Sequence, residues 1–250
     1  MGNDRLQREA HFHDHAFSAD TRARAGKFYW VAARAKQHYQ SLIEADCGGK
    51  TVLEYGCGKG SHAFALARSG AEVSGIDMST EGIRQATARA NAEALGDRLS
   101  FDVMNAEDLA FPDNHFDLVC GSGILHHLDL EKACAELVRV LKPSGRAVFF
   151  EPLGHNPLIN LYRSMTPDMR SADEHPLLED DLDSLATSFL EVKVSYFVLF
   201  ALTAVPFRNL PGITYLLSLL ERVDGALLRL PFAQKHAWLA VIQLEFPKLP

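Results

Sequence analysis

Short apolar runs alternate with helix-like segments between Lys50 and Pro152. Runs rich in β-branched and aromatic residues predict strands at 51–55, 72–76, 99–103, 116–121 and 146–151. Apolar side chains at helical spacing predict helices between them, at about 60–69, 79–95 and 130–141. This alternation is typical of βαβ units around a parallel sheet.

Both flanks of this region have a different pattern. A helical periodicity predicts an amphipathic helix at 27–45, before the first strand. On the other flank we expect a helix at 178–188 and strands at 190–200 and 237–246. Two late strands that are split by an insertion favour an antiparallel edge on an otherwise parallel sheet.

Two insertions interrupt the C-terminal part. Residues 153–177 contain three prolines and mixed charges without a clean period, whereas residues 207–231 carry an apolar stripe at helical spacing. The stripe is compatible with a pocket wall, a contact in a homo-oligomer, or contact with a membrane surface. Three nearby arginines are few for membrane electrostatics, which favours the first two.

Composition and charge narrow the class of protein. With 250 residues, 47% of them hydrophobic, the chain is long enough to bury one sizeable core. The net charge of −7 argues against DNA or RNA as a partner, because nucleic-acid binders usually present a basic face. Four cysteines without a CxxC pair, and a polar start without a signal-peptide pattern, predict reduced thiols and a cytoplasmic location.

Three glycines follow the first predicted strand at two-residue spacing. Gly56, Gly58 and Gly60 precede a helix, and bare backbone there lets a ligand approach the helix N-terminus. Asp77 ends the second predicted strand, where a carboxylate can accept both hydroxyls of a ribose. This arrangement predicts a site for a nucleotide-like cofactor.

The glycine spacing and one acidic residue indicate which cofactor. Dinucleotide sites favour GxGxxG, whereas this turn reads GxGxG. Glu54 would repel a pyrophosphate but suits the ammonium group of an amino acid. The turn therefore resembles the first motif of the class I S-adenosylmethionine-dependent methyltransferases. Residues 73–79, 105–128 and 141–152 are similar to later motifs of that family.

The resemblance implies a fold, a cofactor and its contacts. The family fold is α/β and Rossmann-like, with a mostly parallel seven-stranded sheet, an antiparallel edge strand and helical lid insertions. The implied cofactor is S-adenosyl-L-methionine. The contacts that the resemblance implies are Glu54, Gly56, Gly58, Gly60, Asp77, Met78, Ala106, Glu107 and Ser122.

In these terms the chain is one methyltransferase domain over residues 1–250. An N-terminal helical cap at 1–49 precedes the cofactor-binding core at 50–152. The two insertions, 153–177 and 207–231, are predicted lids over the substrate, and the C-terminal part of the sheet comprises 178–206 and 232–250.

Three residues are candidates for catalysis. His126 and His127 follow the fourth predicted strand, and either can act as a base toward an oxygen or nitrogen acceptor. Glu151 ends the fifth strand, where a carboxylate can stabilise and deprotonate a cationic centre formed by methylation at carbon. Ordinary hydrogen bonds of loop histidines, and a carboxylate satisfied by backbone amides, are equally consistent with these positions.

Substrate contacts are predicted in the cap and the first insertion. Tyr29 can form part of a lid, and Arg163, Arg170 and His175 can hold an acidic group of the acceptor. Packing of the first helix and pairing with neighbouring acids are the simpler interpretations. Histidine occupies every second position from 11 to 15, a poor spacing for a preformed metal site, so we expect no metal.

The resulting prediction is a methyltransferase that acts on a small, largely apolar acceptor. Methylation at carbon with Glu151 is the first interpretation, and methylation at oxygen or nitrogen with His126 or His127 is the alternative. The GxGxG spacing disfavours an NAD-dependent dehydrogenase. A non-catalytic cofactor-binding module has no support, because Glu54, the three glycines and Asp77 are all intact.

Overall fold

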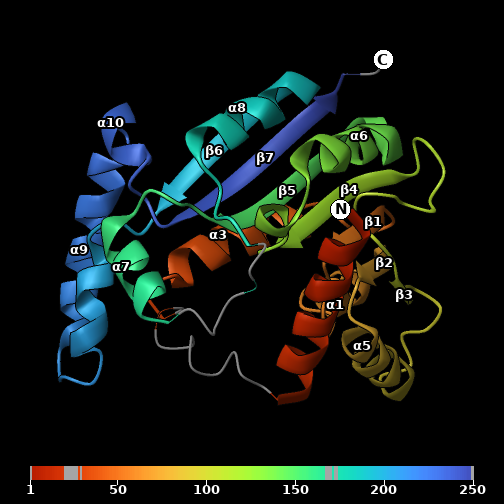
Figure 1. Cartoon of the computed structure of the whole chain (residues 1–250), viewed down its shortest axis with the longest axis horizontal. Helices are drawn as coiled ribbons and strands as arrows, with labels where there is room; N and C mark the ends of the chain where they lie inside the picture. The colour runs from red at the N-terminus through yellow and green to blue at the C-terminus, as the bar shows by residue number, and fades with distance from the viewer. Residues whose placement is uncertain (1, 20–27, 29, 167–170, 172–173, 249–250) are drawn as a thin grey trace.

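One seven-stranded sheet organises the molecule (Figure 1). The computed structural model describes residues 2–19, 28, 30–166, 171 and 174–248. The strand order is β3-β2-β1-β4-β5-β7-β6. The strands are β1 (Thr51–Tyr55), β2 (Glu72–Asp77), β3 (Leu99–Val103), β4 (Phe116–Ser122), β5 (Leu141–Pro152), β6 (Phe189–Phe197) and β7 (Leu239–Pro247).

The sheet is parallel from β3 to β5, and β7 runs antiparallel to both of its neighbours, β5 and β6. This confirms the predicted Rossmann-like, mostly parallel fold. The antiparallel strand β7 lies between β5 and β6, and β6 forms the edge of the sheet.

Helices cover both faces of the sheet because the strands are apolar on both sides. The helices are α1 (Gly2–Ala19), α3 (Ala33–Glu44), α4 (Ala63–Arg68), α5 (Thr80–Ala92), α6 (Leu130–Val140), α7 (Pro157–Met165), α8 (Glu179–Ser188), α9 (Ile213–Leu227) and α10 (Pro231–Gln234). The shorter 3₁₀ segments are η2 (Leu125–His127) and η4 (Ala201–Phe207).

Neighbouring residues of each strand point to opposite faces and enter different cores. Val52 belongs to a core that includes residues of α3, α4 and η4, whereas Leu53 belongs to one that includes residues of α6 and α8. The four cysteines are buried free thiols; Cys47 and Cys120 belong to the first of these cores and Cys134 to the second. Among the described helices, none combines the length and the apolar character needed to cross a bilayer.

Three segments differ from the sequence prediction. Within the helix expected at 27–45, a turn at 30–32 precedes α3, which begins at Ala33. β5 begins directly after α6 instead of after a turn, since Leu141 already pairs with Phe116 before the register shifts. Residues 157–165 form α7 despite their weak periodicity, because the Asn156 side chain accepts hydrogen bonds from the first two free amides and Pro157 fits the first turn.

Candidate cofactor and active site

The glycine turn after β1 has a backbone that favours glycine. Gly56, Gly58 and Gly60 have φ angles of +69°, +54° and +78°. Gly56 and Gly58 line a pocket, and a Cβ at Gly58 would lie 2.8 Å from the ring of Phe17. A Cβ at Gly60 would instead meet Phe64, so this glycine serves the packing of the turn.

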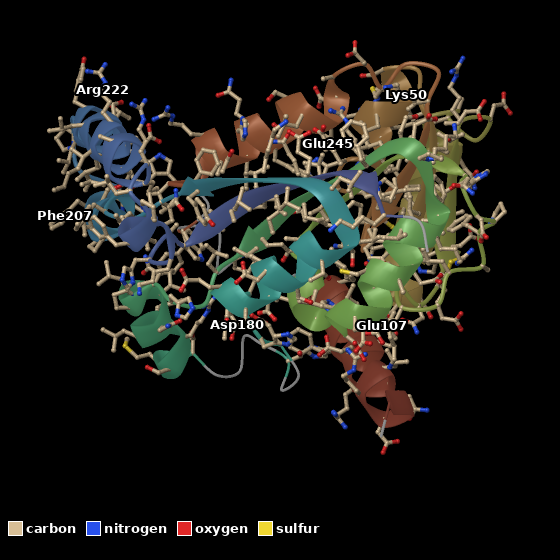
Figure 2. All side chains as sticks on the ribbon, turned by 90° about the horizontal axis from the view of Figure 1, so that it is seen from above. Lys50, Glu107, Asp180, Phe207, Arg222 and Glu245 are labelled. Carbon is tan, nitrogen blue, oxygen red and sulfur yellow. The ribbon has the colours of Figure 1, made fainter. Side chains whose placement is uncertain are left out.

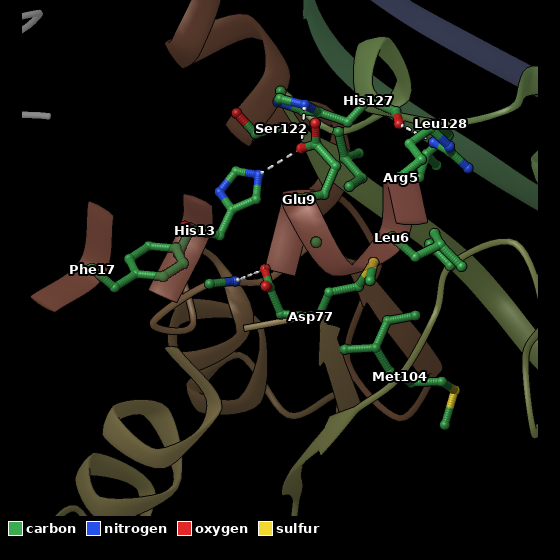
Figure 3. Close-up of a pocket in the computed structure, with 18 residues that line it drawn as sticks. Arg5, Leu6, Glu9, His13, Phe17, Asp77, Met104, Ser122, His127 and Leu128 are labelled. Carbon is green, nitrogen blue, oxygen red and sulfur yellow. Dashed lines mark hydrogen bonds and ion pairs between the residues drawn. The ribbon is translucent and has the colours of Figure 1, made fainter. Parts of the chain in front are cut away.

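Asp77 holds the glycine turn to the start of α5. Its carboxylate accepts hydrogen bonds of 2.8 Å from the backbone N–H of Gly58, drawn in Figure 3, and from that of Ser79. Asp14 of α1 binds the same helix start, since it accepts from the Ser79 hydroxyl at 2.5 Å and from the Glu81 amide at 3.0 Å. Asp77 lines the pocket, as expected for a ribose contact, and also joins the glycine turn to the start of α5.

Glu54 lies behind the glycine turn rather than on the pocket wall. Its oxygens accept hydrogen bonds from the His62 and Ala63 amides at 2.8 and 2.9 Å, at the start of α4. Burial raises the pKa of Glu54 to about 7; the two amides oppose this shift and the nearby Asp77 charge adds to it. Its predicted contact with the cofactor's ammonium group stays a prediction.

Helix α1 forms one wall of the pocket. Arg5, Glu9, His13 and Phe17 recur every fourth residue, so they form a single ridge on the inner face of the helix (Figure 3). The opposite wall comes from the ends of β2 and β4 and from the segments that follow β1, β2, β3 and β4. The pocket is lined by Arg5, Leu6, Glu9, His13, Phe17, Gly56, Gly58, Ser61, Ile76, Asp77, Met78, Met104, Ala106, Ser122, Gly123, Ile124, His127 and Leu128.

A carboxylate of α1 faces two histidines in this pocket. Oε2 of Glu9 lies 3.1 Å from Nδ1 of His127 and 3.5 Å from Nε2 of His13. Burial alone would raise the pKa of Glu9, but His127, His13 and the Ser171 hydroxyl hold it well below its usual range. Burial lowers the pKa of His127, only partly opposed by Glu9. The pair at neutral pH is therefore an ionised Glu9 and a neutral His127.

His126 and Glu151 form a second, deeper pair. Oε2 of Glu151 lies 2.7 Å from Nδ1 of His126, and Oε1 accepts from the Ile124 and Leu125 amides, both at 2.9 Å. Glu151 is fully buried and is absent from the pocket wall. Its contacts fix the loop that carries His127.

The remaining cofactor candidates divide between the pocket wall and its support. Met78, Ala106 and Ser122 line the pocket. Glu107 lies behind it and accepts hydrogen bonds from the Asp129 amide, at 2.8 Å, and from Arg5 of α1. Glu107 therefore helps to attach α1 to the core, and its proposed adenine contact stays a prediction.

The predicted substrate residues are not brought together in this pocket. Arg163 donates to the Leu153 carbonyl at 3.3 Å and to the Asn160 side chain at 3.0 Å. His175 is exposed, and its backbone amide donates to the His126 carbonyl at 3.0 Å. Tyr29 and Arg170 lie outside the described residues.

Two groups in the described chain have the ligand types and spacing for a metal ion. The ligand atoms of Glu9, His13 and His127 lie within 4.8 Å of one another, as do those of His126, His127 and Glu174. His13 is thus the one member of the alternating N-terminal histidines that reaches the site. Oε2 of Glu9 already lies 3.1 Å from Nδ1 of His127, and we keep the prediction that the site works without a metal.

Sequence reasoning missed the contribution of α1. Arg5, Glu9 and Phe17 were not candidates, because a polar segment with scattered histidines does not indicate which face is buried. The available signal was the fourfold spacing of large side chains from position 5 to 17, which marks one face of a helix.

Taken together, the parallel sheet, the glycine turn and the acidic end of β2 define a Rossmann-like domain with a cofactor site for a nucleoside. Residues 53–149 match the family described as "Methyltransferase domain". This match, together with the methyltransferases among the relatives, supports the predicted class I S-adenosylmethionine-dependent methyltransferase domain over residues 53–149.

Curated relatives match mainly this core. Methyltransferase GfsG of Streptomyces halstedii is 35% identical over 131 residues, which cover 52% of this chain and 45% of that protein. The ubiquinone biosynthesis O-methyltransferase of Psychrobacter cryohalolentis is 30% identical over 139 residues, covering 53% and 54%. The chain therefore spans about half the length of the curated relatives it matches.

A solved structure extends the likeness in fold to most of the chain. Geranyl diphosphate C-methyltransferase of Streptomyces coelicolor, in a complex with Mg²⁺, geranyl diphosphate and S-adenosyl-L-homocysteine, aligns with a TM-score of 0.60. The alignment covers 86% of this chain and 80% of that one at 15% identity, and it shows the shared fold only.

Proposed function

We propose that the chain is an S-adenosylmethionine-dependent methyltransferase that acts at an oxygen or nitrogen atom of a small, largely apolar acceptor. The observation that carries this proposal is the position of the Glu9–His127 pair. It shares one pocket with Gly56, Gly58 and Asp77, the residues expected at the cofactor.

The pocket fits the cofactor by its own residues. Gly56 and Gly58 offer bare backbone, and a side chain at Gly58 would fill the space up to Phe17. Asp77 offers a carboxylate for hydroxyl groups, and Met78 and Ala106 offer apolar surface. When it is bound, S-adenosylmethionine supplies an activated methyl group, so the protein's own task is to position the acceptor and manage its proton.

His127 is the residue best suited to accept that proton. Its imidazole is neutral at pH 7, and the Glu9 carboxylate beside Nδ1 favours the tautomer that carries the proton on this nitrogen. Nε2 is then free to act as a base toward a hydroxyl or amine. Glu9 also stabilises the imidazolium that forms, as carboxylates do in other histidine pairs.

An apolar acceptor is supported by the character of the wall. Leu6, Ile76, Met104, Ile124 and Leu128 all line the same pocket. Methylation at carbon with Glu151 beside the reacting atoms remains the alternative from the sequence. It has less support, because Glu151 is fully buried and its two oxygens already have three donors.

The test is the turnover of the His127→Ala variant with a panel of phenols, amines and isoprenoid alkenes. Turnover is measured as the rate at which S-adenosylhomocysteine forms. We expect kcat to fall by about 10²–10⁴-fold with an unchanged affinity for S-adenosylhomocysteine, the usual scale for a positioned base. His11→Ala is the matched control, because His11 is an exposed histidine on α1.

The pH dependence distinguishes the base from a structural histidine. The rate should rise with pH as His127 loses its proton, with the midpoint below 6.5 because burial lowers its pKa. Glu9→Gln should move this midpoint to lower pH, since the Glu9 charge raises the pKa of His127. A folded His127→Ala enzyme with wild-type kcat would exclude this role, as would a pH profile that Glu9→Gln leaves in place.

A further inference from the structure

One end of the molecule carries apolar side chains that the fold leaves uncovered. Figure 1 shows α7, α9 and α10 together at the left, far from β3, and Figure 2 shows Phe207 and Arg222 at the same end from above. We define the apolar end by six exposed side chains of α7, η4, α9 and the start of α10: Leu161, Met165, Phe207, Tyr215, Leu219 and Phe232.

Helix α9 is firmly attached by its other face. Leu217 is buried, and the buried Asp224 carboxylate accepts hydrogen bonds from the amides of residues 199, 200 and 201, at 2.9, 2.8 and 3.1 Å. One turn apart on the outer face, Tyr215 and Leu219 are 84% and 58% exposed. The outer apolar face is therefore a stable feature of a fixed helix.

The exposed charges around this face have one sign. Arg208, Arg222, Arg229 and Lys235 are exposed, whereas the acids of the described residues 207–236 are withdrawn. Of these acids, Asp224 is buried, and Glu221 is half-buried near a guanidinium of α3, 4.0 Å away. This end is thus cationic in a chain whose net charge is −7.

We propose, against the preference drawn from the three arginines in the sequence alone, that the apolar end docks on the surface of an anionic phospholipid bilayer. A helix with aromatic and leucine side chains on its outer face and arginines beside them is suited to lie in the interfacial plane, with its apolar groups at the acyl boundary and its cations at the phosphates. A second copy of the chain fits less well. A symmetric contact would place this cationic end against itself.

The experiment is cosedimentation of the full chain with vesicles. Phosphatidylcholine vesicles that contain phosphatidylglycerol should retain the protein, and phosphatidylcholine alone should bind it far more weakly. Replacing Arg222 and Arg229 together by alanine should weaken binding to the anionic vesicles by about 25-fold, from about fivefold for each cation near the surface. Higher salt should reproduce this loss in the wild type.

Apolar contact is tested by Tyr215→Ser with Leu219→Ser and Phe232→Ser, which should weaken binding by about tenfold or more. The matched control is Leu190→Ser, because Leu190 is 71% exposed on β6, outside the apolar end. All four positions are exposed, so the melting temperatures should stay close to that of the wild type.

Three results would overturn the proposal. The first is wild-type protein that stays in solution with the anionic vesicles. The second is an equal loss of binding in the triple variant and in Leu190→Ser. The third is light scattering that shows a wild-type dimer which the triple variant converts to a monomer, because a second copy would then cover this face.

Discussion

Replacing Glu151 by alanine should destabilise the protein without directly removing a reacting group. The side chain is fully buried and accepts from the Ile124 and Leu125 amides and from His126. Alanine would leave three buried donors without an acceptor. Each unpaired donor costs about 1–3 kcal/mol, so the free energy of unfolding should fall by roughly 3–6 kcal/mol, allowing for relaxation around shared groups.

Urea unfolding monitored by circular dichroism is the assay, with Glu191→Gln as a control at a partly exposed position of β6. Glu151→Gln keeps an oxygen for the two amides and should cost only about 1 kcal/mol. It should also retain kcat within about tenfold, whereas a loss of about 10²–10⁴-fold is expected if Glu151 touches the acceptor.

Two results would refute this reasoning. If Glu151→Ala unfolds at the wild-type urea midpoint, the three hydrogen bonds do not hold the loop. If Glu151→Gln keeps its stability and S-adenosylhomocysteine affinity but loses turnover by 10²-fold or more, Glu151 acts in the reaction and methylation at carbon becomes the better account.

Two further predictions follow from the supports of the glycine turn. Asp77→Ala should weaken S-adenosylhomocysteine binding by about 1.5–3 kcal/mol. It should also lower the melting temperature without ligand, because the Gly58 and Ser79 amides lose their acceptor. An unchanged melting temperature in calorimetry would contradict this structural role of Asp77. The Glu54 carboxyl has a pKa raised to about 7, so the stability it contributes when protonated should be lost between about pH 5 and 7. Urea midpoints of the wild type should therefore fall relative to Glu54→Gln over this range, and parallel profiles would argue against the raised pKa.

The sequence was sufficient for the features that depend on local pattern. Alternation of strand and helix periods predicted the parallel core, and the turn at Gly56, Gly58 and Gly60 was placed correctly because left-handed backbone requires glycine. The pair Asn156-Pro157 is also a local signal for the start of α7, but the weak helical periodicity of the residues after it gave no prediction of a helix.

The side-chain contacts within the site could not be predicted from local sequence pattern. Glu9 meets His127 across more than a hundred residues, and nothing in either neighbourhood encodes this contact. The sequence around Glu151 does not indicate whether its side chain faces the pocket or the η2 loop. Only the packed structure shows that it binds the amides of the loop. A cytoplasmic location, a homo-oligomer and the lid role of 153–177 and 207–231 stay predictions.

The central claim is that the turn after β1 binds S-adenosylmethionine, and calorimetric titration with S-adenosylhomocysteine tests it most directly. We expect one site in the wild type, no comparable binding of NAD, and binding at least about 100-fold weaker in Gly58→Val, because its side chain would occupy the ligand's approach. Gly49→Val is the matched control: Gly49 also has a positive φ, of +74°, but lies in open space. Wild-type affinity in a folded Gly58→Val variant, or binding of NAD in preference to S-adenosylhomocysteine, would contradict the account.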